Sequence, residues 1–440
     1  MPSTRLGLAT AAAACLVVLA PLSFAANAAS NQDPADPSSL SSTQQSGVAT
    51  FAVRDTTPES RTAISKTGVD IFGVRGGYLT FAATPEQAGQ LRAAGFALEP
   101  RSTVKESKAT LDTQRGEVQP FDFPSEDAGY HNFAEQTAEL KKVAADHPNL
   151  AALSSLGKSK QGRNLWLLKI SDNVKTDEAE PEVLFTCQQH AREHLTPEMC
   201  LRIINRYTDG YGQDQAIADM VNNREIWIVT SVNPDGSEYD IARGDYAGWR
   251  KNRQAPSGTD INRNWGYEWG CCNGSSDWTG DQTYRGPSAF STPEAKRVRD
   301  FVNSRVVDGK QQIVTHIDWH TFSELVLWPY GFTHDDTAPG LDQTQARVFQ
   351  ELGTQMAGTN GYTPQQSSDL YITDGTIDDW MWGVHKIWSY TFEMYPSDGG
   401  LEGFYPPDEV IERETSRNDA AVSLLLSYSD CPPRIIGGTC

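Results

Sequence analysis

The sequence predicts an α/β fold in which helices flank both faces of a mixed, mainly parallel β-sheet, preceded by a small α+β region. The chain has 440 residues, enough for two or three domains and a sizeable core. After residue 120, apolar strand-like runs alternate with amphipathic helix-like stretches, which is typical of α/β proteins. The apolar runs suit strands that are buried on both faces. The composition also changes near residue 120, because all 11 Trp and all 8 His lie beyond it.

Residues 1–28 have the features of a secretory signal peptide. Arg5 precedes an apolar run from Ala9 to Leu22, which is too short to span a bilayer, and the small residues Ala26-Asn27-Ala28 offer a cleavage site. No later stretch approaches the roughly 20 apolar residues of a membrane helix. We therefore expect a soluble protein that is secreted to the extracellular space.

The number of cysteines is consistent with secretion. Removal of Cys15 with the signal leaves 7 − 1 = 6 cysteines, an even number that favours disulfides in an oxidising compartment. Only the pair Cys431 and Cys440 is readily predicted, since it closes a short loop at the C-terminus.

Residues 29–120 are predicted to form a propeptide. A Ser/Gln/Pro/Asp-rich lead, Asn31–Gln45, is followed by strand-like alternation in Ala49–Val53 and Val69–Phe81 and by helix-like spacing in Pro85–Ala94. A small module without Trp or His behind a signal peptide is typical of the inhibitory propeptides of secreted hydrolases; an ordinary accessory domain is the alternative. The polar stretch Ser102–Gln119 is the expected processing linker.

Residues 121–440 carry the predicted α/β domain. An amphipathic helix over Phe133–His147 comes first and stops before Pro148. Thr196-Pro197-Glu198 and Thr292-Pro293-Glu294 are expected helix starts, with a capping hydroxyl and a proline where no donor is needed. The buried strands are predicted at Leu165–Ile170, Val183–Thr186, Glu225–Val232, Gln312–Trp319 and Trp388–Phe392.

The charge of the chain argues against nucleic acid as a partner. The net charge is 37 − 57 = −20, and residues 1–120 hold ten basic and ten acidic side chains, so residues 121–440 carry all of the excess. Such a surface repels phosphate. Against this acidic background, a few clustered arginines are candidate ligands for an anionic group.

A candidate metal site is formed by His190, Glu193 and His320. The first two follow the strand at Val183–Thr186, and His320 follows the strand at Gln312–Trp319. A catalytic zinc site uses three nitrogen or carboxylate ligands plus water. Because active sites gather at the C-terminal ends of strands in α/β sheets, the three side chains can converge there.

A rival pattern overlaps this site. His190-x-x-Glu193-His194 also fits the H-x-x-E-H motif, in which both histidines bind zinc from one helix and the glutamate is the base. That arrangement needs helical backbone from His190 to His194, whereas proline at 197 favours a helix that begins only at Thr196. Loss of zinc on replacement of His194 would revive this alternative.

Further polar groups occur downstream. Arg250 lies in the run Trp249–Arg253, and Asn262 and Arg263 place an amide beside a guanidinium, which suits carboxylate recognition. Glu393 ends an apolar strand. Taken singly, the arginines read as surface charges and Glu393 as either a solvated strand end or a general base.

A resemblance decides between these alternatives. Residues Phe121–Cys440 resemble the zinc carboxypeptidase family that includes the pancreatic A and B enzymes, most closely its bacterial carboxypeptidase T branch. The stretches that carry the resemblance, in order, are His190-Ala-Arg-Glu-His, Asn233-Pro-Asp-Gly, Trp249-Arg-Lys-Asn-Arg, Asp260-Ile-Asn-Arg-Asn, Tyr284-Arg-Gly-Pro, Tyr371-Ile-Thr-Asp-Gly, Thr391-Phe-Glu-Met-Tyr and Gly403-Phe-Tyr-Pro-Pro.

The resemblance implies a secreted, zinc-dependent peptidase that acts at the C-terminal peptide bond. It implies one catalytic Zn²⁺, peptide or protein substrates with a free C-terminal carboxylate, an activating protease and a monomer. The implied roles are zinc binding for His190, Glu193 and His320, general base for Glu393, oxyanion stabilisation for Arg250, carboxylate binding for Asn262 and Arg263, closure over the substrate for Tyr371, and a further substrate contact for Arg192.

The resemblance also places a residue at the base of the side-chain pocket, seven positions after Tyr371, which is Asp378. An acid there resembles the B-type enzymes and favours C-terminal Lys or Arg. A one-residue gap would put Asp379 there instead and leave Asp378 as a helix-start residue. The expectation is a dual preference for basic and large apolar residues.

A structural calcium site is a further expectation. Asp177, Glu178 and Glu182 lie in an acidic loop that resembles a calcium-binding loop of the T-type enzymes, and hard oxygen ligands suit Ca²⁺. A solvated acidic loop is the alternative. Cys271 and Cys272 also match that branch, and their pairing stays open.

Two other functions remain in view. One is a peptidoglycan-trimming zinc amidase or endopeptidase on the same fold, which needs no carboxylate clamp of the kind that Asn262, Arg263 and Tyr371 would form. The other is a catalytically inactive peptide-binding module, which would need neither Glu193 nor Glu393.

Overall fold

Two regions of the chain are described by the computed structural model, residues 47–103 and residues 121–440. Both belong to one compact unit. The expected signal peptide, the lead Asn31–Gln45 and the linker from residue 104 onward lie outside the described residues. Among the described residues, no helix is long and apolar enough to cross a bilayer.

Residues 47–103 form a small α+β region. Its antiparallel sheet has the order β2-β3-β1-β4 and is accompanied by helices α1 and α2. The predicted strand-like stretch Val69–Phe81 is a hairpin, because Gly76 and Gly77 adopt positive φ angles of 55° and 82° and turn the chain. The elements are β1 (Ala49–Arg54), α1 (Pro58–Ser65), β2 (Asp70–Arg75), β3 (Tyr78–Ala83), α2 (Pro85–Ala93) and β4 (Glu99–Thr103).

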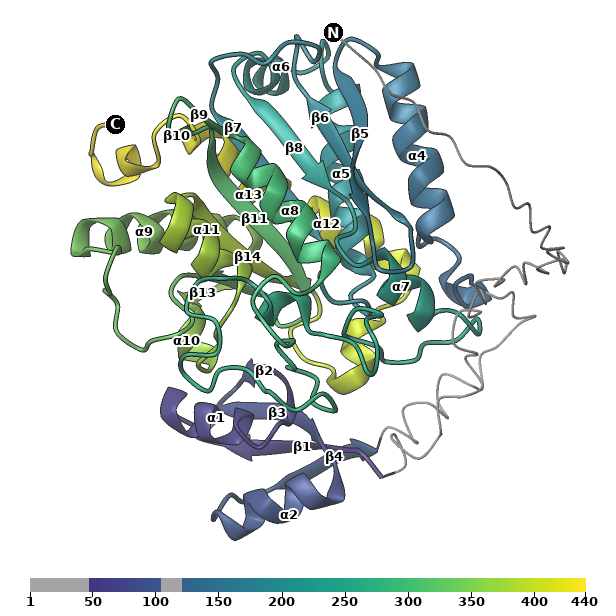
Figure 1. Cartoon of the computed structure of the whole chain (residues 1–440), viewed down its shortest axis with the longest axis vertical. Helices are drawn as coiled ribbons and strands as arrows, with labels where there is room; N and C mark the ends of the chain where they lie inside the picture. Colours follow the sequence, from purple (N-terminus) through teal and green to yellow (C-terminus); the bar gives the residue numbers. More distant parts are fainter. Residues whose placement is uncertain (1–46, 104–120) are drawn as a thin grey trace, which may run out of the picture. The chain divides into compact units, whose positions relative to one another are not determined.

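An eight-stranded mixed sheet is the centre of residues 121–440 (Figure 1). Its order is β13-β12-β14-β11-β7-β8-β6-β5, and the central strands β14, β11, β7 and β8 are parallel to one another. All five predicted strands are present, although β8 ends at Val229 rather than Val232. The strands are β5 (Ala151–Lys158), β6 (Asn164–Ile170), β7 (Glu182–Cys187), β8 (Glu225–Val229), β11 (Ile313–Thr321), β12 (Leu325–Trp328), β13 (Thr363–Gln366) and β14 (Trp388–Met394).

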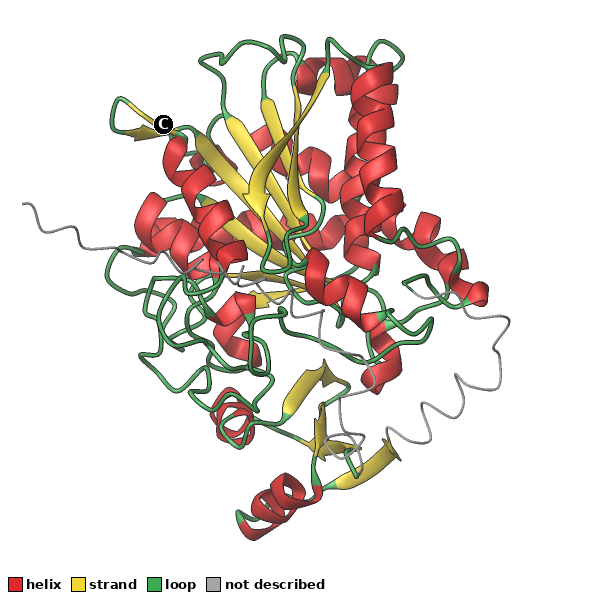
Figure 2. Ribbon diagram, turned by 45° about the vertical axis from the view of Figure 1, so that its right-hand side comes forward, coloured by secondary structure: helices red, strands yellow, loops and turns green. Residues whose placement is uncertain are grey.

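Helices cover both faces of this sheet (Figure 2). One core cluster packs α4, α5, α9 and α13 on the face that carries Phe185, and a second packs α8 and α11 on the face that carries Leu184. The predicted α/β architecture is therefore confirmed. The helices are α4 (Phe133–Asp146), α5 (Leu195–Asp209), α6 (Gln215–Val221), α7 (Pro234–Asp240), α8 (Pro293–Ser304), α9 (Gln343–Asn360), α10 (Ser367–Leu370), α11 (Ile377–His385), α12 (Ile411–Ser416) and α13 (Asp419–Tyr428).

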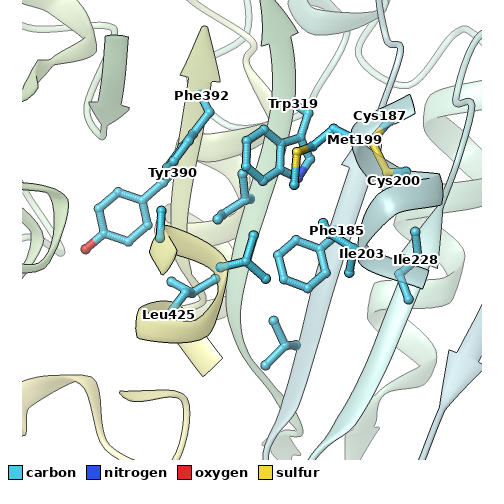
Figure 3. Close-up of a cluster of buried hydrophobic side chains, with 14 of the residues drawn as sticks. Phe185, Cys187, Met199, Cys200, Ile203, Ile228, Trp319, Tyr390, Phe392 and Leu425 are labelled. Carbon is cyan, nitrogen blue, oxygen red and sulfur yellow. A yellow bond between two sulfur atoms is a disulfide. The ribbon is translucent and has the colours of Figure 1, made fainter. Parts of the chain in front are cut away.

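The larger core cluster fixes the ends of β7, β11 and β14. Phe185, Trp319 and Phe392 are fully buried on these three strands, and the Trp319 and Phe392 rings pack with their centres 4.8 Å apart (Figure 3). A disulfide between Cys187 at the end of β7 and Cys200 on α5 ties the helix to the strand. Cys431 and Cys440 are joined as predicted, and Cys271 is joined to Cys272.

The start of α5 corrects one prediction. The helix begins at Leu195, and Thr196 lies inside its first turn, where its hydroxyl donates to the Glu193 carbonyl at 2.8 Å. The predicted N-cap at Thr196 is therefore wrong, whereas Thr292 caps α8 through Ala295 N–H as expected. His190 lies in a bend before the helix.

Candidate active site

The three predicted metal ligands lie together at the C-terminal ends of β7 and β11. His190 and Glu193 come from the bend between β7 and α5, and His320 comes from β11. One ligand atom of each side chain lies within 4.8 Å of the others, and all three residues are buried.

The facing atoms of this cluster suit a divalent cation. The Glu193 carboxylate lies 2.8 Å from His190 Nδ1 and 2.9 Å from His320 Nδ1, and the two nitrogens are 3.1 Å apart. Burial opposes ionisation of Glu193, but the two imidazoles hold its pKa well below the ordinary value. Two imidazoles and a carboxylate that turn one atom each toward a common point are a ligand set that zinc prefers.

Each imidazole is oriented by a carboxylate on its other nitrogen. His190 Nε2 lies 3.1 Å from Asp260, and His320 Nε2 lies 2.5 Å from Asp318. Donation from Nε2 leaves the Nδ1 lone pair free for a metal, and such outer carboxylates raise the basicity of the ligand. Neither aspartate was predicted from the sequence. The signals were the position of Asp318 two residues before His320, on the same face of a strand, and that of Asp260 at the start of the Asp260–Asn264 motif.

Arg250 shares one of these carboxylates. Its Nε and Nη2 donate to Asp260 Oδ2 at 3.1 and 3.0 Å, while Asp260 Oδ1 faces His190. The guanidinium is buried, with 8% of the residue exposed. Asp260 therefore holds a candidate metal ligand and a candidate oxyanion donor in one fixed arrangement.

Glu393 lies beside the metal cluster because of the strand register. In the parallel pair of β11 and β14, Glu393 is the direct neighbour of His320, so that both side chains emerge on the same face. It is the only residue of β14 that is half-buried rather than buried. Burial raises the pKa of its carboxyl, as expected for a group poised to accept a proton.

A cavity of about 80 Å³ connects the predicted site residues. The metal cluster, Arg250 and Glu393 line it together with groups from three other segments. The predicted site residues in its wall are His190, Glu193, Arg250, Asn262, Arg263, His320, Tyr371, Asp378 and Glu393.

The candidate carboxylate clamp lies in this cavity. The Arg263 guanidinium donates to the Asn262 carbonyl at 2.8 Å and to the Tyr371 hydroxyl at 3.4 Å. The Asn262 side chain accepts from Ile377 N–H at 2.9 Å, which fixes it against the start of α11. The arrangement offers a guanidinium, an amide and a phenol to one anionic group.

Asp378 and Asp379 differ in what their side chains contact. Asp378 lines the cavity and is hydrogen-bonded to the Ser389 and Thr391 hydroxyls of β14. Asp379 accepts from Gly331 N–H at 2.9 Å and is not among the lining residues. Of the two acids, Asp378 is the one that faces the cavity.

Among the residues predicted to bind zinc or substrate or to act in catalysis, Arg192 alone does not line this cavity. Its guanidinium forms a bidentate ion pair with Asp70 of β2, at 2.6 and 3.0 Å, and lies 3.8 Å from the centre of the Phe404 ring. The residues that follow Asp70, Ile71 and Phe72, line the cavity. The edge of the N-terminal region therefore occupies the approach to the metal cluster.

His194 has a structural environment. Its Nε2 lies 2.9 Å from Asp240, and its ring packs edge-on against Phe123 at 4.9 Å. It is not part of the metal cluster, and the backbone at His190 is not helical. The inverted H-x-x-E-H arrangement is therefore contradicted by the geometry.

The residues predicted as calcium ligands do not come together as one group. Asp177 and Glu182 both bind the Arg305 guanidinium, at 2.7 and 2.5 Å, and they lie with Glu225 rather than with Glu178. Glu178 instead lies with Asp172 and Glu180, whose carboxylate oxygens are within 4.8 Å of one another. The predicted triad was wrong because the sequence did not indicate where Arg305 would lie.

A buried His, Glu and His set with a carboxylate and a guanidinium beside it, at the C-terminal ends of sheet strands, is the site of a zinc-dependent hydrolase. The family is given by the sequence profile described as Zinc carboxypeptidase, which matches residues 136–421. The chain belongs to the zinc carboxypeptidase family, and this family implies Zn²⁺ as the cofactor.

Individual relatives agree with this assignment. The chain is 55% identical over 445 residues to a zinc carboxypeptidase of Saccharothrix mutabilis subsp. capreolus, with 100% of both chains covered. It is 30% identical to carboxypeptidase B of Astacus astacus over 64% of this chain and 91% of that protein. The crystal structure of carboxypeptidase A from Helicoverpa armigera has the same fold, with a TM-score of 0.72 and 23% identity over 87% of this chain and 97% of that chain. Closeness to the carboxypeptidase T branch stays a prediction.

Proposed function

We propose that this protein is a secreted exopeptidase, made as a precursor, that hydrolyses the C-terminal peptide bond of peptides and proteins. The observation that supports this proposal is one cavity that holds the metal cluster, Glu393 and the Asn262, Arg263 and Tyr371 group. A cation reserved for a carboxylate at a fixed place beside the reacting atoms would restrict cleavage to a chain end.

The catalytic roles follow from the chemistry of peptide hydrolysis. His190, Glu193 and His320 would hold zinc, which when bound polarises the scissile carbonyl and makes water more acidic. Glu393 takes the proton of the attacking water and passes it to the leaving amine nitrogen as the C–N bond breaks. Arg250 stabilises the negative charge that develops on the carbonyl oxygen, and Asp260 keeps its guanidinium in place.

The remaining groups would position the substrate. Asn262 and Arg263 bind the terminal carboxylate, Tyr371 closes over it, and Asp378 receives the side chain of the residue that is removed. A basic side chain is neutralised by the acid, and large apolar side chains are tolerated by apolar groups of the pocket such as Leu327. Arg192 would contact substrate once Asp70 has left.

The division into a signal peptide (1–28), a propeptide (29–120) and a catalytic domain (121–440) is part of the proposal. The ion pair of Asp70 with Arg192, and the position of Ile71 and Phe72 in the cavity wall, support an inhibitory role for residues 29–120. An activating protease would then cut before the catalytic domain, which we propose to act as a monomer. N-terminal sequencing of the exported protein, before and after activation, tests both boundaries.

Calcium binding is retained as a proposal only for the corrected group Asp172, Glu178 and Glu180. One carboxylate oxygen each of Glu178 and Glu180 is buried without a hydrogen-bond partner among the described residues. Burial, together with the neighbouring Glu178 and Asp172, raises the pKa of Glu180 to about 7. Calcium should raise the melting temperature and Glu180→Gln should abolish the effect, whereas an equal effect in both proteins would contradict this site.

A direct test compares one peptide with its C-terminal amide. We expect the processed protein to cleave the free-carboxylate peptide, to leave the amide intact and to lose activity with a chelator until zinc is restored. Equal cleavage of both peptides would instead favour the amidase or endopeptidase. No cleavage of either by zinc-loaded protein would favour the inactive binding module.

A further inference from the structure

A continuous chain of buried hydrogen bonds leads from the metal cluster to the pocket acid Asp378. Asp318, which orients His320, accepts from the Thr186 hydroxyl at 2.5 Å. Thr186 Oγ1 lies 2.9 Å from His316 Nε2, and His316 Nδ1 lies 2.7 Å from Ser389 Oγ. Ser389 in turn is hydrogen-bonded to Asp378. All members are at most 4% exposed, so water does not share these bonds.

The hydrogen atoms in this chain can be counted from its Asp318 end. Asp318 also faces the ring nitrogen of His320 and the amide of Gln189, both at 2.5 Å. A carboxylate surrounded by three donors accepts from all of them and is ionised. Thr186 therefore gives its only hydrogen to Asp318, and it must accept from His316 Nε2.

At the Asp378 end of the hydrogen-bond chain, one hydrogen atom too few is available. A neutral imidazole has one N–H, which His316 gives to Thr186, so its Nδ1 accepts the hydrogen of the Ser389 hydroxyl. Ser389 then has no hydrogen left for Asp378. The bond between Ser389 and Asp378 requires a hydrogen on the carboxyl group, unless His316 is a cation.

The environment favours the carboxyl group over the imidazole as the site of this proton. Burial lowers the pKa of His316 to about 4. Burial, and after it the charge of Asp318, raises the pKa of Asp378 to about 7. A neutral acid beside a neutral imidazole is therefore the more stable arrangement in an interior without water.

We propose that Asp378 is a protonated carboxylic acid in the resting pocket and that it exchanges this proton for a cationic substrate side chain. The neutral acid accepts large apolar C-terminal residues. When Lys or Arg enters, the proton leaves to solvent and the Ser389 hydroxyl turns from His316 to the ionised Asp378. The inference rests on the proposed role of Asp378 at the base of the pocket.

The consequence is a specificity that changes with pH. Asp378 faces His316, whose Nδ1 is 3.9 Å away, as well as the charges of Asp318 and His320 on β11. Burial raises the pKa of Asp379, the next residue of the same helix, to about 8, and its carboxyl accepts from the Gly331 N–H instead. Asp318 is held ionised by its donors, and Glu393 serves every substrate alike. The preference for a basic over an apolar residue should therefore rise as Asp378 loses its proton.

The test is the ratio of kcat/KM for two peptides that differ only in having Arg or Phe at the C-terminus. The ratio is measured from about pH 5 to 9, the range in which a carboxyl group with a raised pKa titrates. Protein made as the full chain and then processed is used. Ionisation of Glu393 and of zinc-bound groups cancels in this ratio. We expect a rise of at least about tenfold through one midpoint, since a full charge appears next to the guanidinium. If the ratio does not change with pH while the Arg peptide is still cleaved, the proton exchange is wrong and the proposed function stands. If the Arg peptide is not cleaved at any pH, the proposed preference for basic residues is wrong.

Two variants test the chain of hydrogen bonds between Asp318 and Asp378. Asp378→Asn should give a low ratio that is flat with pH. Thr186→Val removes the bond that uses the His316 hydrogen, so that His316 can donate to Ser389 and Ser389 to an ionised Asp378. The midpoint should then shift to lower pH. The matched control is Thr315→Val, because this buried β11 hydroxyl has no hydrogen-bond partner among the described residues. An unchanged midpoint in Thr186→Val contradicts the proton count.

Calorimetry gives a readout that does not depend on turnover. Binding of free arginine and of free phenylalanine is measured near pH 6 in two buffers with different ionisation enthalpies. Arginine should release up to about one proton more than phenylalanine. Equal release for the two ligands, with both bound, would refute the exchange.

Discussion

Asp70 and Arg192 form a bidentate ion pair between a half-buried carboxylate and a buried guanidinium, with oxygen-to-nitrogen distances of 2.6 and 3.0 Å. The aspartate belongs to the N-terminal sheet, and the arginine follows the candidate metal ligand His190 by two positions. The Asp70 carboxylate thus occupies the guanidinium of Arg192, which we propose contacts an anionic or polar group of the substrate. It holds the N-terminal region against the site by a directional contact.

Replacement of Asp70 should therefore weaken inhibition in the uncut protein. Asp70→Asn leaves Arg192 buried without its charge partner, a loss of about 3 kcal/mol for buried pairs. We expect the unprocessed chain to gain peptidase activity, while activity after processing is unchanged. The matched control is Asp55→Asn, an exposed aspartate of the same region. Identical residual activity in both variants and the parent would show that the ion pair does not maintain latency.

Replacement of single histidines should distinguish the zinc ligands His190 and His320 from His194, which we expect not to bind zinc. His190→Ala and His320→Ala should lower the bound zinc, measured by elemental analysis, far below one ion per chain. His194→Gln should retain zinc, since its ring contacts Asp240 and Phe123 instead. If His194→Gln lost zinc while it stayed folded, the inverted motif would have to be reconsidered.

Glu393→Gln should keep the metal and lose the reaction. The amide is nearly the same size but does not accept a proton, and general base catalysis typically contributes about 10²–10⁴ in rate. We expect kcat to fall by that order, with normal zinc content and with little change in the binding of free phenylalanine. A loss confined to KM would assign Glu393 to substrate binding instead.

Asp260→Asn should affect metal binding and catalysis together. Asp260 contacts His190 through one oxygen and Arg250 through the other. Outer-sphere partners of this kind typically change metal affinity or activity by about 10–100-fold. Zinc affinity by competition with a chelator, and kcat at saturating zinc, should therefore both fall. A loss of kcat with unchanged zinc affinity would limit the role of Asp260 to Arg250.

Asp127 should make the stability of the protein depend on pH. Burial raises the pKa of this carboxyl to about 6, and the Tyr246 hydroxyl donates to it at 2.6 Å. The folded state therefore binds the proton more tightly than the unfolded state. This stability is complete below the ordinary pKa of about 3.8 and is lost as the pH rises through about 6.

Asp127→Asn should remove that loss, because the amide oxygen accepts the Tyr246 bond without a charge. The free energy of unfolding at pH 8 should rise by an amount on the order of 2–3 kcal/mol relative to the parent. The gain should be only about half as large at pH 5, where most of Asp127 is still protonated in the folded state. Equal effects of the substitution at both pH values in urea unfolding would show that Asp127 does not titrate in this range.

The sequence predicted the α/β sheet, its five buried strands and the His190, Glu193 and His320 cluster, because apolar runs and ligand types are local properties. It did not predict Asp260 and Asp318 as the partners of the ligands, since an aspartate near a strand end reads as a surface charge until the neighbouring strands are placed. The disulfide of Cys187 with Cys200 was equally hidden. The grouping of Asp177, Glu178 and Glu182 failed because Arg305, more than a hundred residues away in the chain, lies among them.

The register of β11 and β14 sets the distance between Glu393 and His320. Glu393 and His320 are direct neighbours in the parallel pair of β14 and β11, so the sheet sets the gap between the proposed base and the candidate metal ligand, at about 4.8 Å between strands. Side-chain substitutions can alter the acidity of either group, but only a slip of the strands can alter that spacing. A one-residue slip would turn Glu393 to the opposite face. The packing of Trp319 against Phe392 therefore supports the proposed site, and small cavities introduced there should reduce turnover before they unfold the protein.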